Sequence, residues 1–402
     1  MKILYISTNF LALTHTFITR EINEVRAAGN TVGLLALRRI RPEDETRNPL
    51  CDVSQCRYVY PVGFARVLLS FLGMLVRRPV RVLSAVRTAF SDSEDSLMTK
   101  FKSGYQLMVT TTLVPWVEAE GFEHLHAHFA SPPTTFAMFL HILTGIPYTF
   151  TGHGADLFRD RSCLKPKISR ATGIVCISEY NKAYYHKLVP NLARTCIVHC
   201  GIDLKKFSLR EPQSTKNSLF IFGVGRLVPK KGFHVLLEAL GKFKEKGFSW
   251  SAAIAGDGPL RQELKEQADR LGISENVSFL GNISQEEIRD LLGRADVFVL
   301  PSVPVDDGDI DGIPVSLMEA MAVGCPSIST KVSGIPELIL DGETGILTEP
   351  GDAAGIVEGL CRLAVDPKLV AQLRERGRRK IEQEFNIADV GNKLASFFSS
   401  LK

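Results

Sequence analysis

The sequence predicts an α/β protein with two similar halves, each built around a parallel sheet. Short runs rich in β-branched and apolar residues alternate with helical patterns along the chain, as in βαβ units. A polar segment at 207–217 interrupts this alternation near the middle. The length of 402 residues also suits two domains better than one.

The first half predicts strands at 2–7, 31–37, 124–128, 147–151 and 173–177. Helical patterns at 16–28, 96–120 and 178–189 lie between these strands. We therefore expect an N-terminal, acceptor-side domain at 1–206, followed by a linker at 207–217.

The second half predicts strands at 218–224, 251–255, 277–280, 296–300 and 326–329. We expect a C-terminal domain at 218–384 and a final helix at 385–402 that packs back on the N-terminal domain. Ligands of open α/β sheets bind beyond the carboxyl ends of the strands. Two such sheets facing each other would place the ligands in a cleft.

Composition excludes several classes of protein. A net charge of +4 is too small to indicate nucleic-acid binding. The eight cysteines are scattered without a CxxC pair, which favours reduced thiols over a disulfide framework or a zinc site. No signal peptide or apolar run of membrane-spanning length is recognisable. We expect a cytoplasmic protein.

The segment 61–90 contains five arginines, no acidic residue and many apolar residues. Such a basic amphipathic element is typical of a surface that contacts an anionic membrane, here the inner face of the cell membrane. A core helix with a solvated basic edge is an equally good interpretation of the same pattern.

The segment DGIPVSLMEAMAVG, which starts at Asp311, is the most informative motif. Pro314 suits the first position of a helix, where the N–H groups near Val315 and Ser316 can bind an anion such as phosphate. Glu319 can accept hydrogen bonds from ribose hydroxyls, and Asp311 can bind a second polyol. Sugar, diphosphate and ribose in this order predict a nucleotide sugar.

A second motif, GVGRLVPKKGFHVLLEAL, starts at Gly223 and follows a predicted strand. It matches the dinucleotide fingerprint poorly, because Val228 replaces the last glycine. Arg226 and Lys231 share a strand-to-helix loop and can neutralise a departing diphosphate without a metal. Taken alone, this loop would be better explained as a solvated basic turn.

The third motif is AIAGDGPLRQEL, in which Gly256 and Gly258 allow close backbone approach and Pro259 begins a helix. Such a turn commonly borders a nucleotide, although a plain strand–turn–helix connector explains it equally well. The acidic run DDGDIDG at 306–312 has the spacing of a divalent-cation site, but we expect a solvated loop there.

Histidines mark the predicted N-terminal domain. His153 follows a strand and is flanked by glycines, so we expect it to face the ligand. The segment HLHAH places His124, His126 and His128 on one face of a strand, which is compatible with zinc but is better explained by a core strand. We expect only His128 of the three to face the cleft, and Thr14 and Thr16 to lie on an acceptor-side loop.

Together these motifs resemble glycosyltransferase family 4, whose fold is GT-B, with two Rossmann-like domains. The segments GRLVPKKG, AGDGPL, DVFVLPS, DGIPVSLMEAMAVGCPSIST, SGIPELI and DGETGILTEPGD carry the resemblance. Within the family, HAHFA, THTFITREI and the run before DGIPVSLMEAMAVG are similar to bacterial exopolysaccharide enzymes of the colanic-acid type.

The resemblance implies a retaining, metal-independent glycosyltransferase of the hexosyltransferase class. The donor would be a UDP- or GDP-sugar, and the acceptor a hydroxyl of a growing, lipid-linked oligosaccharide. By family pattern the catalytic residues are His153, Arg226, Lys231 and Asp311. Donor contacts are expected from Gly225, Arg226, Lys231, Gly256, Gly258, Asp311, Gly312, Ile313, Pro314, Val315 and Glu319.

Two departures from the family pattern leave alternatives open. The usual Glu-x7-Glu pair is Asp311-x7-Glu319 here, and the loop after the first strand contains no glycine. A catalytically idle homologue that only binds nucleotide sugars is the main alternative. A dinucleotide-dependent oxidoreductase is disfavoured by the missing fingerprint and by the basic pair Arg226 and Lys231.

Overall fold

The computed structural model describes residues 1–10, 16–39, 55–192, 194–209 and 218–401. The chain divides into two compact units, which are described separately below. The first unit contains Met1–Gly201 and Ile387–Lys402, and the second contains Ile202–Asn386. Phe207, the first residue of the expected linker, belongs to the second unit and is buried.

The first unit is built on a seven-stranded parallel sheet with the order β3-β2-β1-β4-β5-β6-β7. Its strands are β1 (Lys2–Ser7), β2 (Thr31–Ala36), β3 (Arg57–Tyr58), β4 (His124–His128), β5 (Tyr148–Gly152), β6 (Gly173–Cys176) and β7 (Arg194–Ile197). Its helices are α1 (Thr16–Ala27), α3 (Phe64–Arg77), α4 (Pro79–Ala89), α5 (Leu97–Thr111), α6 (Val114–Ala119), α7 (Pro132–Thr144), α8 (Ala155–Phe158), α9 (Leu164–Arg170), α10 (Glu179–Leu188) and α18 (Ile387–Ser400).

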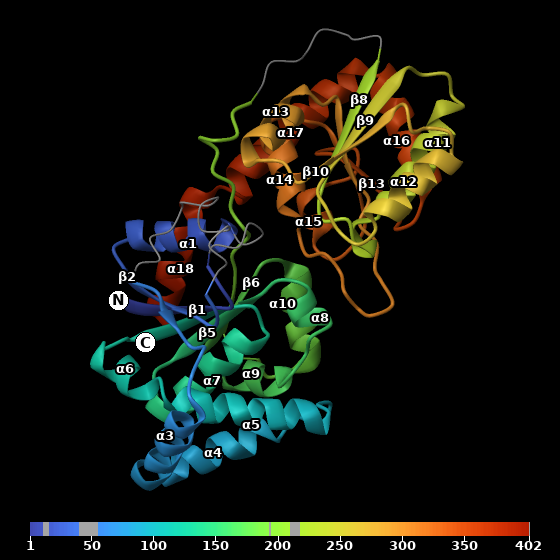
Figure 1. The fold of residues 1–402 in the computed structure, drawn as a ribbon. Helices are drawn as coiled ribbons and strands as arrows, with labels where there is room; N and C mark the ends of the chain where they lie inside the picture. Colours follow the sequence, from blue (N-terminus) through green and yellow to red (C-terminus); the bar gives the residue numbers. More distant parts are fainter. Residues whose placement is uncertain (11–15, 40–54, 193, 210–217, 402) are drawn as a thin grey trace. The chain divides into compact units, whose positions relative to one another are not determined.

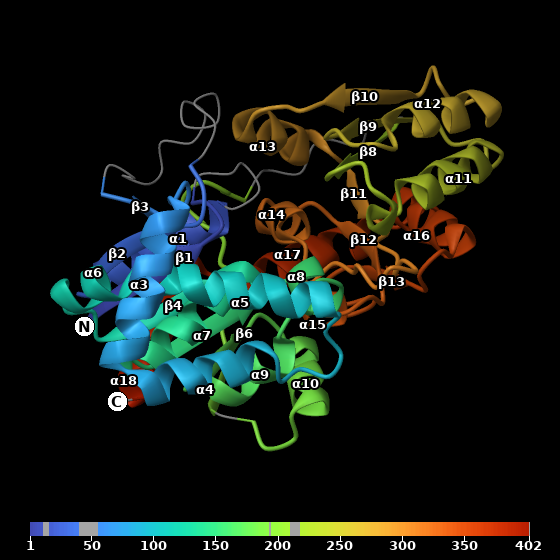
Figure 2. The same cartoon turned by 60° about the horizontal axis from the view of Figure 1, so that its bottom comes forward.

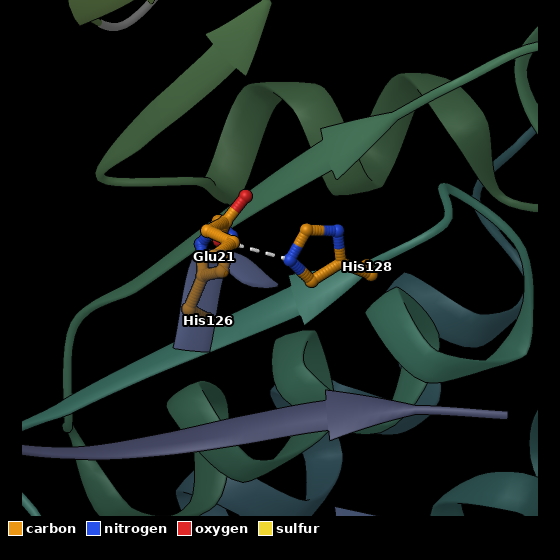
Figure 3. Close-up of side chains that lie close together, drawn as sticks. All are labelled: Glu21, His126 and His128. Carbon is orange, nitrogen blue, oxygen red and sulfur yellow. Dashed lines mark hydrogen bonds and ion pairs between the residues drawn. The ribbon is translucent and has the colours of Figure 1, made fainter. Parts of the chain in front are cut away.

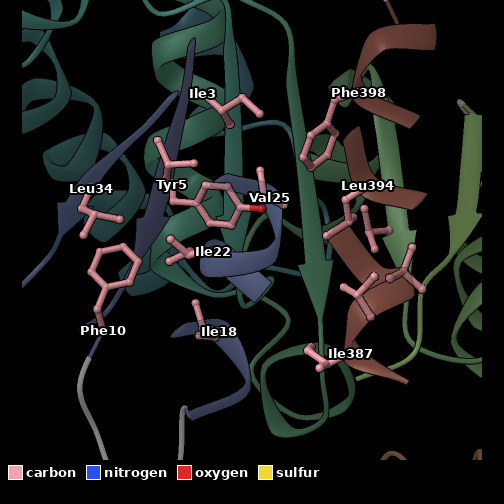
Figure 4. Close-up of a cluster of buried hydrophobic side chains, with 14 of the residues drawn as sticks. Ile3, Tyr5, Phe10, Ile18, Ile22, Val25, Leu34, Ile387, Leu394 and Phe398 are labelled. Carbon is pink, nitrogen blue, oxygen red and sulfur yellow. The ribbon is translucent and has the colours of Figure 1, made fainter. Parts of the chain in front are cut away.

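Helices cover both faces of this sheet (Figure 1). On one face, α18 packs along α1, and the apolar side chains of both helices join the core of β1 and β2 (Figure 4). A Cβ atom at Gly391 would lie 2.5 Å from the carbonyl oxygen of Glu24, so only glycine allows α18 to approach α1 this closely. On the other face, α7 contacts β4 and β5, and α4 and α5 form a further layer over α7 (Figure 2).

The second unit is built on a six-stranded parallel sheet with the order β10-β9-β8-β11-β12-β13. Its strands are β8 (Leu219–Val224), β9 (Trp250–Ala255), β10 (Val277–Gly281), β11 (Val297–Leu300), β12 (Ser327–Thr330) and β13 (Ile346–Thr348). Its helices are η2 (Pro229–Lys231, a 3₁₀ turn), α11 (Phe233–Lys244), α12 (Arg261–Arg270), α13 (Gln285–Arg294), α14 (Val315–Ala322), α15 (Ile335–Leu338), α16 (Ala353–Val365) and α17 (Pro367–Glu384).

Every strand expected from the sequence is present, with ends that differ by no more than one residue. The strands that the sequence pattern missed are β3, β7 and β13, which are short and lie at sheet edges. The expected helix at 96–120 is two helices, α5 and α6, and Pro115 lies at the start of the second. The segment 61–90 is likewise divided into α3 and α4 by Arg78 and Pro79, because proline cannot continue a helix.

Candidate functional site

In the second unit, the donor-site residues expected from the sequence follow three neighbouring strands. Gly225, Arg226 and Lys231 follow β8, Gly256 and Gly258 follow β9, and the segment 311–319 follows β11. Because β9, β8 and β11 are adjacent and parallel, their carboxyl ends lie at one edge of the sheet. The fold therefore brings these three loops together, as ligand sites of α/β sheets require.

Glycines let the three loops touch along their backbones. A Cβ atom at Gly256 would lie 2.0 Å from the oxygen of Gly225, and one at Gly258 would lie 2.4 Å from the oxygen of Leu227. At Gly232, whose φ is +67°, a Cβ atom would lie 1.8 Å from the oxygen of Pro301. These glycines thus hold the loops after β8, β9 and β11 in direct contact.

Ion pairs link the loop after β8 to the loop after β11. Lys231 Nζ lies 2.9 Å from Asp311 Oδ2, which also accepts a hydrogen bond of 2.8 Å from Ser302 Oγ. Lys230 Nζ lies 2.9 Å from Asp309 Oδ1 and 3.6 Å from Asp311 Oδ1. Asp311 is buried and pairs with Lys231, and its contact with a second polyol stays a prediction.

Arg226 differs from these lysines because it is exposed. Within the described ranges no acidic side chain forms an ion pair with it, so its guanidinium is available to an incoming anion. Its planar fork suits two phosphate oxygens.

The N-terminus of α14 follows the loop after β11, which is one of these three loops. The helix begins at Val315 with Pro314 as its N-cap, so Pro314 precedes the helix instead of occupying its first position. The first helical hydrogen bonds are donated to Pro314 O by Leu317 and Met318. The N–H groups of Val315 and Ser316 therefore occupy the positions at which a helix binds an anion.

Glu319 lies one turn into α14 and its side chain is buried. Pro259, by contrast, does not begin a helix: it lies in a turn, and α12 begins at Arg261 with Leu260 as its N-cap.

The acidic loop 306–312 is only partly solvated. Asp306 and Asp307 are exposed as expected, whereas Asp309 and Asp311 are paired with lysines. Lys230 and Asp309 were missed as site residues from the sequence. The sequence does not reveal this pair, because spacing alone does not show which basic and acidic side chains of the two loops meet.

In the first unit, His153 and His128 lie at the carboxyl ends of the adjacent strands β5 and β4. His128 Nδ1 and His153 Nε2 are 3.1 Å apart. The ring of His153 packs on Phe17 and Phe129, with centroids 4.7 and 5.2 Å away. Phe129 has a φ of +74°, which is uncommon for a non-glycine residue and places strain beside the histidine pair.

His128 does not face solvent, which corrects the expectation that it lines an acceptor site. Its side chain is wholly buried, and its Nε2 lies 3.0 Å from Glu21 Oε1. His153 is partly exposed and lines a small recess with Phe17, Glu21, His199 and Cys200, among others. Thr14 lies outside the described residues, and Thr16 is the first residue of α1.

The histidines of β4 are core residues, as the sequence favoured. His124 Nε2 and His126 Nδ1 both lie 2.8 Å from Thr149 Oγ1, and both rings pack on Phe398 of α18. Burial lowers the pKa of His124 to about 4, and burial also lowers the pKa of His126 well below its ordinary value. Both imidazoles are therefore neutral near neutral pH.

Glu21 of α1 is the residue of this site that the sequence analysis missed. Together with His126 and His128 it forms, within the part of the chain that is described, a group whose ligand atoms lie within 4.8 Å of one another (Figure 3). A carboxylate on the apolar stripe of Ile18, Ile22 and Val25 was the signal that could have revealed it.

Asp156 holds the loop that carries His153. Its carboxylate accepts backbone hydrogen bonds from His153, Gly154 and Ala130 at 2.8 to 3.2 Å. Burial raises the pKa of Asp156, and these N–H donors counteract that effect. Asp156 therefore fixes the backbone at His153 and Gly154, just after β5, and ties it to Ala130, just after β4.

Comparison with known proteins identifies what these two units belong to. Residues 15–206 match the family model described as Glycosyltransferase Family 4, and residues 205–380 match the one described as Glycosyl transferases group 1. WcaL of Escherichia coli, named for colanic acid biosynthesis, is 37% identical over 209 residues, which are 52% of each chain. The amylovoran biosynthesis glycosyltransferase AmsK of Erwinia amylovora is 36% identical over 62% of this chain and 63% of its own.

The aligned part thus spans between half and two thirds of these relatives. Solved structures match over the whole chain. Anabaena HepE in complex with UDP and glucose has a TM-score of 0.71 and 18% identity, and both chains are covered completely. Sucrose-phosphate synthase from Thermosynechococcus elongatus has a TM-score of 0.74 and 17% identity over 100% of this chain and 99% of its own.

The two parallel-sheet units and these structural neighbours confirm the predicted GT-B fold. With adjoining family models that together match residues 15–380, the chain belongs to the glycosyltransferases, in the family described as Glycosyltransferase Family 4 and Glycosyl transferases group 1.

Proposed function

We propose that this glycosyltransferase moves a sugar from a nucleoside-diphosphate sugar to a hydroxyl of a growing, lipid-linked oligosaccharide in bacterial exopolysaccharide synthesis. The observation that carries the proposal is the meeting of exposed Arg226, Lys231, buried Glu319 and the α14 terminus at one sheet edge. Structural neighbours bind UDP and UDP-glucose, and relatives are named for colanic acid and amylovoran biosynthesis. The donor is a UDP- or GDP-sugar.

In this mechanism the diphosphate leaves while Arg226, Lys231 and the N–H groups of Val315 and Ser316 stabilise its growing charge. These cations do the electrostatic work for which other transferases use a metal, so the reaction needs none. Glu319 binds the ribose, while Asp311 positions Lys231 and contacts the donor sugar through its other oxygen.

The transfer retains the anomeric configuration. The bond from the sugar carbon to the leaving phosphate breaks, and the acceptor oxygen bonds to the same face of that carbon. The acceptor proton passes to the leaving phosphate oxygen. In this proposal His153 orients the transferred sugar.

The test uses Arg226→Ala, with Arg270→Ala as the control. Both arginines are exposed in the second unit, but Arg270 is in α12, remote from the three loops. Arg226→Ala should lower transfer from the active UDP- or GDP-sugar by roughly 10²–10³-fold without changing the melting temperature. Unchanged turnover contradicts the assignment, and nucleotide-sugar binding without any transfer in the wild type supports the idle homologue.

We also propose that α3 and α4 contact an anionic membrane surface. Within the described residues no helix is long and apolar enough to cross a bilayer. Large apolar side chains are nevertheless exposed on both helices, including Leu69 at 70%, Val76 at 82% and Val80 at 78%. Arg66, Arg77, Arg81 and Arg87 are exposed among them, and the segment contains no acid to offset their charge. This composition fits the boundary between acyl chains and anionic headgroups.

Co-sedimentation with vesicles tests this contact. Val76→Glu should reduce binding to vesicles that contain anionic lipid, whereas Val365→Glu should not. Val365 is 66% exposed but lies in α16 of the second unit, so it is matched for exposure. Binding that is equal for both variants, or independent of anionic lipid, argues against the membrane surface.

A further inference from the structure

A continuous hydrogen-bonded chain runs from the core of the first unit to His153. Tyr5 Oη donates to Glu21 Oε1 at 3.0 Å, and His128 Nε2 lies 3.0 Å from the same oxygen (Figure 3 shows Glu21 and His128). His128 Nδ1 then lies 3.1 Å from His153 Nε2. We refer to Tyr5, Glu21, His128 and His153 as the relay.

Four separate elements hold the relay, so its geometry is fixed. Its members come in order from β1, α1, β4 and the loop after β5. Tyr5 and His128 are wholly buried, and Glu21 is 9% exposed. Burial and the neighbouring Glu21 raise the pKa of Tyr5, so its hydroxyl keeps its proton and donates.

The donor roles along the relay follow from the chemistry of each group. A carboxylate only accepts hydrogen bonds, so the His128 nitrogen that faces Glu21 carries a proton. A neutral imidazole has one N–H, which leaves Nδ1 of His128 as an acceptor. A neutral ring suits a wholly buried side chain, since an imidazolium would lose its hydration there. The proton of the last bond therefore lies on Nε2 of His153.

We propose that Glu21 and His128 are positioning residues that hold His153 in its Nε2–H tautomer. In this tautomer Nδ1 of His153 is an acceptor, the type of atom that a hydroxyl group and not an anionic phosphate would contact. This inference rests on the proposed function only in placing His153 beside the sugar. The tautomer itself is independent of activity.

The same atoms of Glu21, His126 and His128 are close enough to bind a metal ion. Hydrogen bonding explains the distances better, because Glu21 Oε1 already accepts from Tyr5 and from His128. His126 Nε2 lies farther away, at 3.6 Å, and a threonine hydroxyl, Thr151 Oγ1, is 3.3 Å from that nitrogen.

Two-bond ¹H–¹⁵N correlation spectra of the full-length protein with labelled histidine test the tautomer directly. The His153 signals are assigned by their loss in His153→Asn. We expect Nε2 protonated and Nδ1 unprotonated in the wild type. A wild-type His153 protonated at Nδ1, as a doubly protonated His128 would impose, overturns the proposal even if every variant fails to fold.

Glu21→Leu then tests the role of the relay. Leucine cannot accept the Nε2–H of His128, so the tautomer of His128 is no longer fixed and the His153 proton shifts in part from Nε2 to Nδ1. We expect this shift together with a fall in kcat of about tenfold or more, and little change in the KM of the donor. His141→Asn is the control, because His141 is half-buried in α7 and bonds the backbone of Ile146 outside the relay.

The outcomes separate the two proposals. If the wild type transfers sugar but Glu21→Leu changes neither tautomer nor kcat, the relay is wrong and the proposed function stands. If no sugar is transferred but the spectra show the Nε2–H form, the tautomer stands and the proposed function fails. Stoichiometric zinc in the purified protein that Glu21→Leu removes overturns the relay in favour of a metal site.

Discussion

The carboxyl ends of the two sheets carry polar groups of different kinds. In the first unit, Tyr5, Glu21 and His128 are buried and bonded to one another, and only His153 reaches the surface. In the second unit, lysines and aspartates pair across two loops, and Arg226 is exposed beside them.

This difference teaches how one fold can divide a reaction. A buried hydrogen-bond network fixes the orientation and the tautomer of a single ring, that of His153. It does so because a buried polar group without a partner would destabilise the fold. A cluster of paired cations instead offers charge that an incoming anion can recruit. In the proposed mechanism the first arrangement supplies geometry and the second supplies electrostatic stabilisation, and four predictions test this contrast.

The largest effect is expected when the recruitable charge is removed. Lys231→Met should lower turnover by roughly 10²–10³-fold, the usual effect of losing one electrostatic stabiliser. Lys242→Met is the control, because Lys242 also forms an ion pair, 2.7 Å from Glu238, but on the surface of α11. Steady-state kinetics with the active donor measure both. Similar turnover in the two variants would show that ion-paired lysines in this unit contribute alike, against a special role for Lys231.

The contact between loops is the next target. Gly232→Ala places a methyl group against Pro301 O, whereas Gly247→Ala, at a similar φ of +79°, meets nothing within 4 Å. We expect Gly232→Ala to lower the free energy of unfolding of the second unit by at least roughly 2 kcal/mol more than Gly247→Ala. Trp250 in a Trp116→Phe background reports this unit in denaturant titrations. Equal losses would mean that backbone strain at positive φ, not loop contact, determines the need for glycine.

The fold was predictable from the sequence because buried parallel strands have a clear sequence pattern. Buried strands such as β1 and β11 are continuous apolar runs, and the loops after them carry glycine and charge. Edge strands lack that signal: β3 has two residues, Arg57 and Tyr58, both half-buried. A proline inside a helical pattern, such as Pro115 in 96–120, is the sequence signal for the division between α5 and α6.

The candidate site was predictable only in part. Residues that follow a strand, such as Arg226 and His153, are placed by topology and could be named. Glu21 and Lys230 act through partners that lie far away in the chain, 107 residues away for Glu21 and His128 and 79 for Lys230 and Asp309. No spacing rule links such pairs, because tertiary packing alone brings them together.

A smaller effect is expected when the cations are released from their aspartate. Asp311→Asn removes the charge 2.9 Å from Lys231 and 3.6 Å from Lys230. We expect UDP or GDP, whichever is the nucleotide of the donor, to bind about tenfold more tightly, a change of about 1.4 kcal/mol. Titration calorimetry at two salt concentrations measures this, with Asp306→Asn as the exposed control in the same loop. Unchanged or weaker binding would mean that Lys231 does not reach the diphosphate.

The smallest effect concerns the buried histidines of the first unit and the pH dependence of stability. Burial lowers the pKa of His124 from 6.5 to about 4. As the pH falls through about 6.5, His124 becomes protonated in the unfolded chain, whereas in the folded chain it stays neutral until about pH 4. Folding therefore loses stability across this window, by roughly 1 kcal/mol between pH 7 and 5.5 from His124 alone.

His124→Asn should remove the contribution of His124 to the pH dependence of the free energy of unfolding. The contribution of His126 should remain. Exposed His186→Asn should leave the slope unchanged. Trp116 in a Trp250→Phe background reports the first unit, and the second unit is an internal reference because His234, its one described histidine, is exposed. Equal slopes for wild type and His124→Asn would mean that this part of the core accepts a charged ring. The buried arrangement on which the contrast between the two sheet edges depends would then fail at His124.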